Sequence, residues 1–187
     1  TSNHSIRKIV IATGTVTTLA GRAGLPGDTD GTGSAAGFHS PAGIATDGTN
    51  LYVADTYNHS IRKVVIATGV VTTLAGHRSE FSGGEMGISD YPELSTADGV
   101  GAKASFSFPQ GIMSDGTNLY VADTLGEKIR KIVIATGEVS TIVGSDALGS
   151  TDGIGSTATF NRPSGITSDG FDLFLTDSNN NMIRRIH

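Results

Sequence analysis

The sequence contains no cysteine and no tryptophan, and only 5 of its 187 residues are proline. Without cysteine, disulfide bonds and metal sites built on thiolates are excluded. No apolar run approaches the roughly 20 residues that a membrane-spanning helix needs. Aromatic residues make up only 6% of the chain, and the formal net charge is −5. Both values disfavour nucleic-acid binding, which relies on basic surfaces and on aromatic rings that stack with bases.

Glycine is abundant by comparison, with 26 residues. With so few prolines, these glycines indicate turns in a folded chain and not a disordered linker. The composition does not shift along the sequence, so we expect residues 1–187 to form one domain. The lack of cysteine fits an exported or a cytoplasmic protein, and frequent Thr, Ser, Gly and Asn favour an exported bacterial one, secreted or at the cell surface. Because the first residue is Thr, we expect a processed chain or a piece of a longer one.

A long sequence unit recurs along the chain. It combines an Ile-Arg pair with a Pro-x-Gly-Ile motif and an Asp-Gly pair, all in a common register. The Ile-Arg pairs begin at Ile6, Ile61, Ile129 and Ile183, and the Pro-x-Gly-Ile motifs begin at Pro41, Pro109 and Pro163. A repeat this regular indicates stacked modules, because each unit must pack on the next to bury its apolar face.

Each unit is predicted to form four short strands. In the first complete copy they cover residues 43–46, 51–54, 60–66 and 70–75, with Asp-Gly and Thr-Gly turns between β-branched runs. Glycine suits such turns because it adopts positive φ without steric cost. Four antiparallel strands in a unit of about 40–50 residues predict one blade of a β-propeller. The predicted fold class is therefore all-β, with about three blades in this chain.

The repeat also predicts where the blades lie. A partial blade is expected over 1–21, blades over 38–76 and 106–144, an insertion over 77–97 and a second partial blade over 160–187. Residues 2–9 and 179–186 are the same element of the repeat, so the chain holds one strand more than three blades require. We expect a segment of a longer array of blades, or a terminal strand that pairs with a neighbouring molecule.

The insertion is the least repetitive part of the chain. It is polar and rich in glycine, and long irregular loops on a rigid scaffold often carry function. We therefore predict a partner-binding loop here. Its candidate contact residues are Arg78, Glu80, Phe81, Glu85, Met86, Asp90 and Tyr91.

Aspartate and arginine recur as pairs separated by 7 residues. The pairs are Asp55 with Arg62, Asp123 with Arg130, and Asp177 with Arg184. A charge pair that repeats in every unit is predicted to join neighbouring strands, because a catalytic group would depart from the repeat. Cross-strand pairs of opposite charge contribute roughly 0.2–1 kcal/mol each. No catalytic residue is predicted.

Aspartates in the Asp-Gly-x-Gly loops are candidates for calcium binding. These candidates are Asp28, Asp30, Asp98 and Asp152. Calcium needs 6–8 oxygen ligands, and each loop offers only one or two carboxylates. We therefore favour structural turns with no cofactor and keep calcium as the alternative. The phenylalanine that follows each loop is predicted to lie in the core between blades.

Residues 50–63, with the Pro-x-Gly-Ile motif before them, resemble the NHL repeat. The Asn-His-x-Ile-Arg signature of this family is intact at 3–7 and at 58–62, and only its Ile-Arg part persists at 125–130 and 179–184. The resemblance covers the chain outside the insertion. It implies a β-propeller, most often of six blades, which is about twice the number expected here.

The leading functional hypothesis is a non-enzymatic interaction or structural scaffold that self-assembles through open blade edges. Its partner would be a protein, either a second copy or the rest of a longer chain. An alternative is a segment of a propeller lyase or hydrolase whose active residues lie elsewhere in that chain. A weaker alternative is glycan or nucleic-acid binding.

Overall fold

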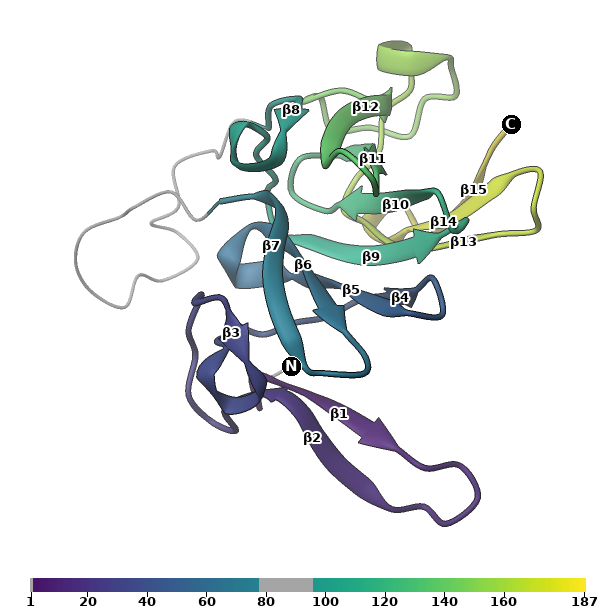
Figure 1. Cartoon of the computed structure of the whole chain (residues 1–187). Coiled ribbons are helices and arrows are strands. Elements are labelled where there is room, and N and C mark those ends of the chain that lie inside the picture. The colour runs from purple at the N-terminus through teal and green to yellow at the C-terminus, as the bar shows by residue number, and fades with distance from the viewer. Residues whose placement is uncertain (1, 78–95) are drawn as a thin grey trace.

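The computed structural model of the chain describes residues 2–77 and 96–187. Its strands form four antiparallel sheets that follow one another along the chain (Figure 1). The helical elements among the described residues are 3-10 turns of three residues, such as η2 (Thr56–Asn58). None of the described helices is long and apolar enough to cross a membrane. The chain is thus an all-β protein, as its sequence predicts.

Two of the sheets are complete blades with five strands each. The first contains β3 (Gly31–Thr32), β4 (Ile44–Thr46), β5 (Asn50–Asp55), β6 (Ser60–Val65) and β7 (Val70–Gly76). The second contains β8 (Gly99–Val100), β9 (Pro109–Ser114), β10 (Asn118–Asp123), β11 (Lys128–Val133) and β12 (Glu138–Gly144). Their strand orders are β3-β7-β6-β5-β4 and β8-β12-β11-β10-β9. Each order is the predicted four-stranded meander with one short strand added.

The added strands β3 and β8 come from loops that the sequence assigned to turns. In the first blade, Gly31 pairs with Val71 and Thr32 pairs with Val70. The pairing satisfies backbone groups on the outer edge of β7, which would otherwise be left open. This short pairing escaped prediction because two residues carry no measurable strand periodicity.

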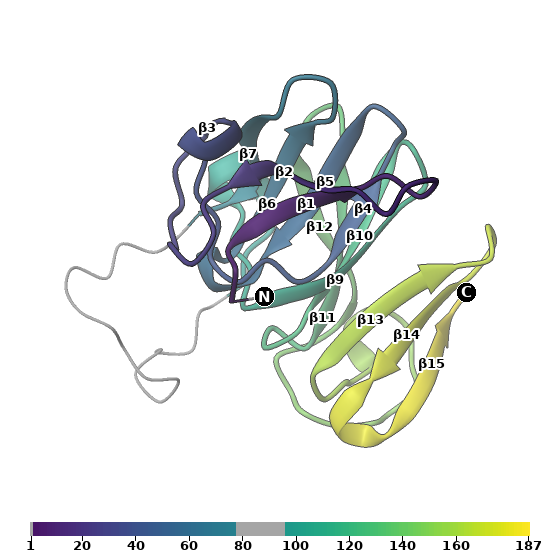
Figure 2. The same cartoon turned by 90° about the horizontal axis from the view of Figure 1, so that it is seen from below.

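The other two sheets are incomplete blades. The N-terminal sheet has only β1 (Ser5–Ile9) and β2 (Val16–Gly21), which correspond to the third and fourth strands of a blade. The C-terminal sheet has β13 (Pro163–Ser168), β14 (Leu173–Asp177) and β15 (Met182–Ile186), which correspond to the first three. Seen from below, the C-terminal sheet lies beyond the second complete blade, away from β1 and β2 (Figure 2).

Three hydrophobic clusters join the successive sheets. Each cluster is built around one buried phenylalanine, and the three are Phe38, Phe106 and Phe160. The first cluster brings Ile6 and Ala20 of the N-terminal sheet onto Val53 and Val64 of the first blade. The core therefore lies between blades, and a blade with no neighbour leaves its apolar face uncovered.

The Pro-x-Gly-Ile motif sets how closely the inner strands approach. Strands β4, β9 and β13 lie side by side (Figure 1). A Cβ atom at Gly43 would lie 2.1 Å from the backbone oxygen of Gln110, and one at Gly111 would lie 2.0 Å from that of Ser164. Only glycine fits this contact, because the next blade's backbone occupies the space of a side chain.

Candidate functional site

A buried arginine binds two aspartates in each blade. Arg62, on β6, donates from Nη1 to Asp55 Oδ2 at 2.9 Å and from Nη2 to Asp30 Oδ1 at 2.8 Å. The same two nitrogens donate to the backbone oxygens of Gly37 and Thr29 at 3.0 and 3.1 Å. We call this arrangement of one arginine with an inner and an outer aspartate the arginine clamp.

The arginine clamp repeats in the second blade and in the C-terminal sheet. Arg130 binds Asp123 and Asp98, both at 2.8 Å. Arg184 binds Asp177 at 3.0 Å and Asp152 at 2.7 Å. Each guanidinium also lies over a cluster phenylalanine, with its central carbon 5.1–5.4 Å from the ring centroid. The clamp therefore ties two strands and a loop together at the edge of each hydrophobic cluster.

Burial makes these pairs different from the exposed cross-strand pairs that the sequence analysis described. The side chains of Asp55 and Arg62 are 0% and 1% exposed, and those of Asp123 and Arg130 are both 0% exposed. Losing one partner would leave a buried charge uncompensated, which costs about 3–5 kcal/mol. The value of roughly 0.2–1 kcal/mol expected for a cross-strand pair is therefore too low for the loss of one partner.

In the clamp of the second blade, the inner and the outer aspartate have opposite pKa shifts. Burial raises the pKa of Asp55, and it raises the pKa of Asp123 to about 6. At Asp98 partial burial acts in the same direction, but hydrogen bonds from Thr141 and Arg130 outweigh it and lower the pKa of this carboxyl. In this clamp the outer aspartate, Asp98, is thus the one held firmly as a carboxylate.

The outer aspartates also fix the fourth strand of each complete blade. Thr73 of β7 donates from its backbone nitrogen and its hydroxyl to Asp30, at 3.2 and 3.0 Å. Thr141 of β12 makes the same bonds to Asp98, at 3.0 and 2.9 Å. Asp152 binds Arg184 in the C-terminal sheet, where the fourth strand is missing, and its side chain is 93% exposed.

Three of the four aspartates named as calcium candidates bind clamp arginines. Asp30, Asp98 and Asp152 are the outer aspartates of the three clamps, and the side chain of Asp28 is exposed. Within residues 2–77 and 96–187, no group of three or more His, Asp or Glu side chains is placed to hold a metal ion.

Residues that the sequence analysis treated as ordinary repeat positions form a second set of joints. The ring of His4 accepts a hydrogen bond at Nδ1 from the backbone nitrogen of Ser40 at 2.9 Å, and His59 accepts one from Phe108 at 3.2 Å. Glu127, at the same position of the second blade, accepts from the backbone nitrogen of Arg162 at 2.6 Å. We call these bonds the backbone latches. A signal for them is present in the sequence, because Asn-His occurs twice at one repeat position.

The predicted partner loop lies outside the described residues. This applies to all seven of its candidate contacts: Arg78, Glu80, Phe81, Glu85, Met86, Asp90 and Tyr91.

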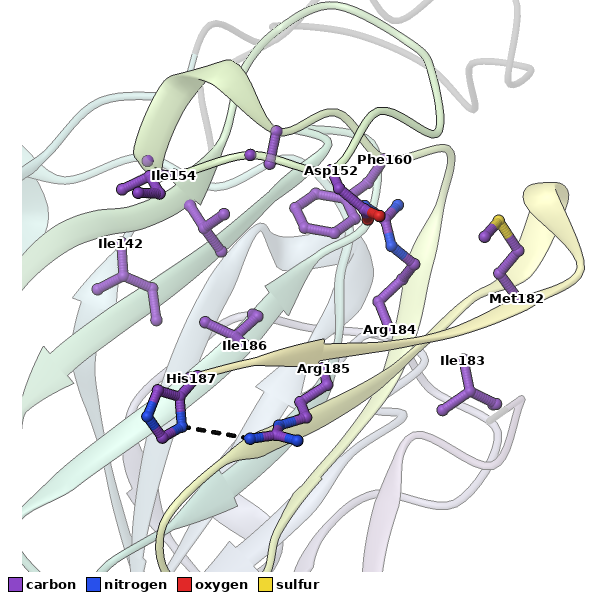
Figure 3. A pocket seen from close by; sticks show the side chains of 14 residues that line it. Ile142, Asp152, Ile154, Phe160, Met182, Ile183, Arg184, Arg185, Ile186 and His187 are labelled. Atoms are coloured by element: carbon purple, nitrogen blue, oxygen red, sulfur yellow. Dashed lines mark hydrogen bonds and ion pairs between the residues drawn. The ribbon is translucent and has the colours of Figure 1, made fainter.

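A groove of about 590 Å³ lies along the open edge of the C-terminal sheet (Figure 3). Strand β15 forms one wall, and the loop that carries Asp152 and Ile154 forms another. Ile142 of β12 and the ring of Phe160 also line it. Ile154 and Ile183 are 91% and 70% exposed, so the groove presents apolar side chains and one carboxylate to solvent.

This fold and its repeated clamps define a partial β-propeller. Residues 38–64 match the NHL repeat family. The chain thus contains an NHL repeat, and the repeat units in the same register on either side of the match extend the likeness along the described residues.

Three known proteins are similar to this chain, and the chain spans less than half of the length of each. It is 35% identical over 155 residues to the chloroplastic protein SUPPRESSOR OF QUENCHING 1 of Arabidopsis thaliana, which spans 80% of this chain and 14% of that protein. A Bacteroides thetaiotaomicron protein of unknown function has a TM-score of 0.74 at 25% identity, over 98% of this chain and 42% of that one. Virginiamycin B lyase from Staphylococcus aureus has a TM-score of 0.53 at 18% identity, over 99% and 49%. The likeness to the lyase shows a shared fold only.

Proposed function

We propose that this chain is a non-catalytic propeller scaffold that binds protein by adding a β-strand to its open C-terminal blade. The groove beside β15 carries this proposal. Its walls are the counterparts of the segments that hold β7 in the first complete blade, so it has the form of an empty strand position.

The correspondence holds on both sides of the missing strand. Strand β7 pairs with β6 on one side and with Gly31–Thr32 on the other. The counterparts of these two segments are residues 183–186 and residues 153–154, and both line the groove. A strand between them would gain backbone hydrogen bonds on both edges, which is the basis of binding by strand addition.

Side chains in the groove define the kind of strand that fits. Val71 and Val139, on the fourth strands of the complete blades, are 1% and 2% exposed. The unbound walls of the groove are apolar at the corresponding place, around Phe160 and Ile186. In the complete blades, Asp30 and Asp98 accept hydrogen bonds from a threonine of the fourth strand. The carboxylate of Asp152 can accept the same bonds in the groove. The expected ligand is therefore an extended segment with a valine and, two residues later, a threonine.

A peptide of residues 68–77, TGVVTTLAGH, tests the proposal. We expect saturable binding of the labelled peptide in fluorescence anisotropy. The same peptide with Val71→Asp should bind at least about tenfold more weakly, because burying a valine side chain is worth about 1.5–3 kcal/mol. Equal binding of the two peptides would contradict the proposal.

Matched substitutions in the protein locate the binding site. Ile183→Asp should abolish peptide binding because it places a carboxylate in the groove. Ile11→Asp is the control, since Ile11 is also exposed, at 99%, but lies in the turn that follows β1. Neither residue is buried in the free chain, so both variants should fold. Binding that survives Ile183→Asp would place the peptide elsewhere.

A further inference from the structure

The N-terminal hairpin exposes side chains that complete blades bury. Ile9 and Val16 are 62% and 48% exposed. Their counterparts in the two complete blades are 0–2% exposed, and these are Val64, Val71, Ile132 and Val139. The difference arises because these counterparts pack against the sheet that precedes them, in the clusters of Phe38 and Phe106, whereas no sheet precedes β1 and β2 among the described residues.

Arg7, also on this hairpin, lacks the two aspartates that bind the clamp arginines. It occupies the repeat position of the clamp arginines Arg62, Arg130 and Arg184. Its side chain is exposed, and among the described residues none forms a hydrogen bond or an ion pair with it. The inner and outer aspartates of its clamp would come from a second strand and a loop that precede β1 in the repeat.

The C-terminal sheet contains the groups that this hairpin lacks. It has the first two strands, β13 and β14, an inner aspartate at Asp177, an outer aspartate at Asp152, and the cluster residue Phe160. A hairpin with a third and a fourth strand would complete this blade. The opposite charges of Arg7 and of the two aspartates match in the register that the complete blades define.

Strand β15 already occupies the third-strand position, where Arg184 binds Asp177 and Asp152, so an exchange must replace this clamp by the one that Arg7 would form. Ile183 of β15 is 70% exposed, whereas its counterpart Ile6 in β1 is 7% exposed. Strand β1 packs on the first blade through its cluster and through the backbone latch from His4 to Ser40. Strand β15 pairs with β14, and among the described residues no fourth strand pairs with its other edge. The hairpin supplies a third strand already paired with a fourth one, so in an exchange between copies β15 is the strand that is displaced.

We propose that two copies of this chain exchange their N-terminal hairpins, an inference that rests on the proposed strand addition and names its partner. Strands β1 and β2 of one copy replace β15 and fill the groove beside β13 and β14 of the other. Arg7 then binds Asp177 and Asp152 of the other copy, and Thr18 takes the place of Thr73 and Thr141 on Asp152.

Two copies are expected to form a closed ring, because each one both donates a hairpin and accepts one. Each copy donates a hairpin at one end and accepts one at the other, so a head-to-tail interface generates a ring where the rotation closes. The chain covers 42–49% of the solved propeller chains that it resembles, so two copies supply about the length of one. Each ring would contain the two complete blades of each copy and two composite blades.

Mass measurement of charge variants tests the exchange. Light scattering after size exclusion should give twice the 19.1 kDa mass of one chain. Arg7→Glu should give the single-chain mass, because it would place a third carboxylate beside Asp177 and Asp152. Lys8→Glu is the matched control and should remain dimeric, since Lys8 is the adjacent exposed residue on the opposite face of β1. A dimeric Arg7→Glu variant would overturn the proposal, as would a wild-type mass that grows beyond two copies.

A cross-link then identifies the contact itself. The chain has no cysteine, so Thr18→Cys and Asp152→Cys introduce the only thiols. Mixed after unfolding and refolding together, the two variants should form a covalent heterodimer upon oxidation, because the counterpart side chains lie 2.9–3.0 Å apart in the complete blades. Absence of this cross-link in a dimeric sample would overturn the exchange. A monomeric wild-type chain that still binds the peptide of residues 68–77 would overturn the exchange and leave the proposed function standing.

Discussion

Arg130 and Asp123 form an ion pair at 2.8 Å in which both side chains are 0% exposed. Their burial is possible because most of the other polar groups have partners. Arg130 also binds Asp98 and two backbone oxygens through its terminal nitrogens, and Asp123 accepts from the backbone nitrogen of Ser107 at 2.6 Å. Among the described residues, Arg130 Nε alone of the guanidinium nitrogens is buried without a partner. An ion pair satisfied in this way fixes the position of three segments of the blade.

The inner aspartate of a clamp should therefore matter more to stability than the outer one. Asp123→Ala leaves the buried guanidinium of Arg130 without its innermost partner, and we expect it to lower the free energy of unfolding by about 3–5 kcal/mol. Asp98→Ala is the matched control, because Asp98 binds the same arginine from a half-exposed position. We expect a loss of about 1 kcal/mol there. Denaturation by guanidinium measures both, and equal losses would contradict the assignment.

The inner-strand glycines should be intolerant of a single methyl group wherever a blade follows. Gly111→Ala would place Cβ 2.0 Å from the backbone oxygen of Ser164, so the blades must separate, at a cost of at least about 1–3 kcal/mol. Gly165→Ala is the same substitution where no blade follows in the chain, with only the Thr176 hydroxyl at 3.1 Å. Thermal unfolding of both, in the Arg7→Glu background that keeps the chain single, should show a clear loss for Gly111 only.

Tyr52 should resist ionisation in the folded protein. Its side chain is buried, and its hydroxyl donates to Asp47 Oδ2 at 2.7 Å. Burial, followed by this hydrogen bond and the negative charge of Asp47, raises the pKa of Tyr52 to about 12. A spectroscopic titration of phenolate should show one tyrosine that ionises near that pH, and Tyr52→Phe should remove this step. Persistence of the step in the variant would assign it to another tyrosine.

The sequence predicts the parts of this structure that repeat and misses the parts that depend on contacts between units. Strand positions, hairpin turns and the cluster phenylalanines follow from periodicity and glycine placement. The depth at which Asp55 and Arg62 are buried does not, because it depends on the loop that carries Asp30. Burial of that kind comes from residues 25–33 positions away, which local patterns do not report.

The ends of the chain illustrate the same limit at a larger scale. The count of Ile-Arg pairs indicates a surplus strand, but only the structure shows that Arg7 is exposed while Arg184 is bound. The hydrogen bonds of the backbone latches could not be predicted from the sequence either, although the Asn-His pairs at 3–4 and 58–59 mark the residues that form them. Whether such a hydrogen bond forms depends on which backbone nitrogen of the next blade lies beside the side chain.

The backbone latches at His4 and His59 should weaken as the pH falls. Each ring accepts a hydrogen bond at Nδ1, so it must be unprotonated there, and burial lowers the pKa of His4 below its ordinary value of about 6.5. As the pH falls through that value, the unfolded chain binds the proton first and stability is lost. The loss is complete below the lowered pKa of the folded state. We expect about 0.5–1.5 kcal/mol for each latch.

A double variant isolates this effect. Asp123 contributes with the opposite sign between about pH 4 and 6, because its raised pKa makes the folded state bind the proton first. The informative quantity is therefore the difference between the wild type and His4→Asn/His59→Asn, measured by guanidinium denaturation at pH 7.5 and pH 5. Asparagine keeps an acceptor without a titratable ring, and Asn181 already holds this position in the C-terminal sheet with a φ of 55°. The wild type should lose stability relative to the double variant at the lower pH, whereas His77→Asn, at an exposed histidine, should follow the wild type.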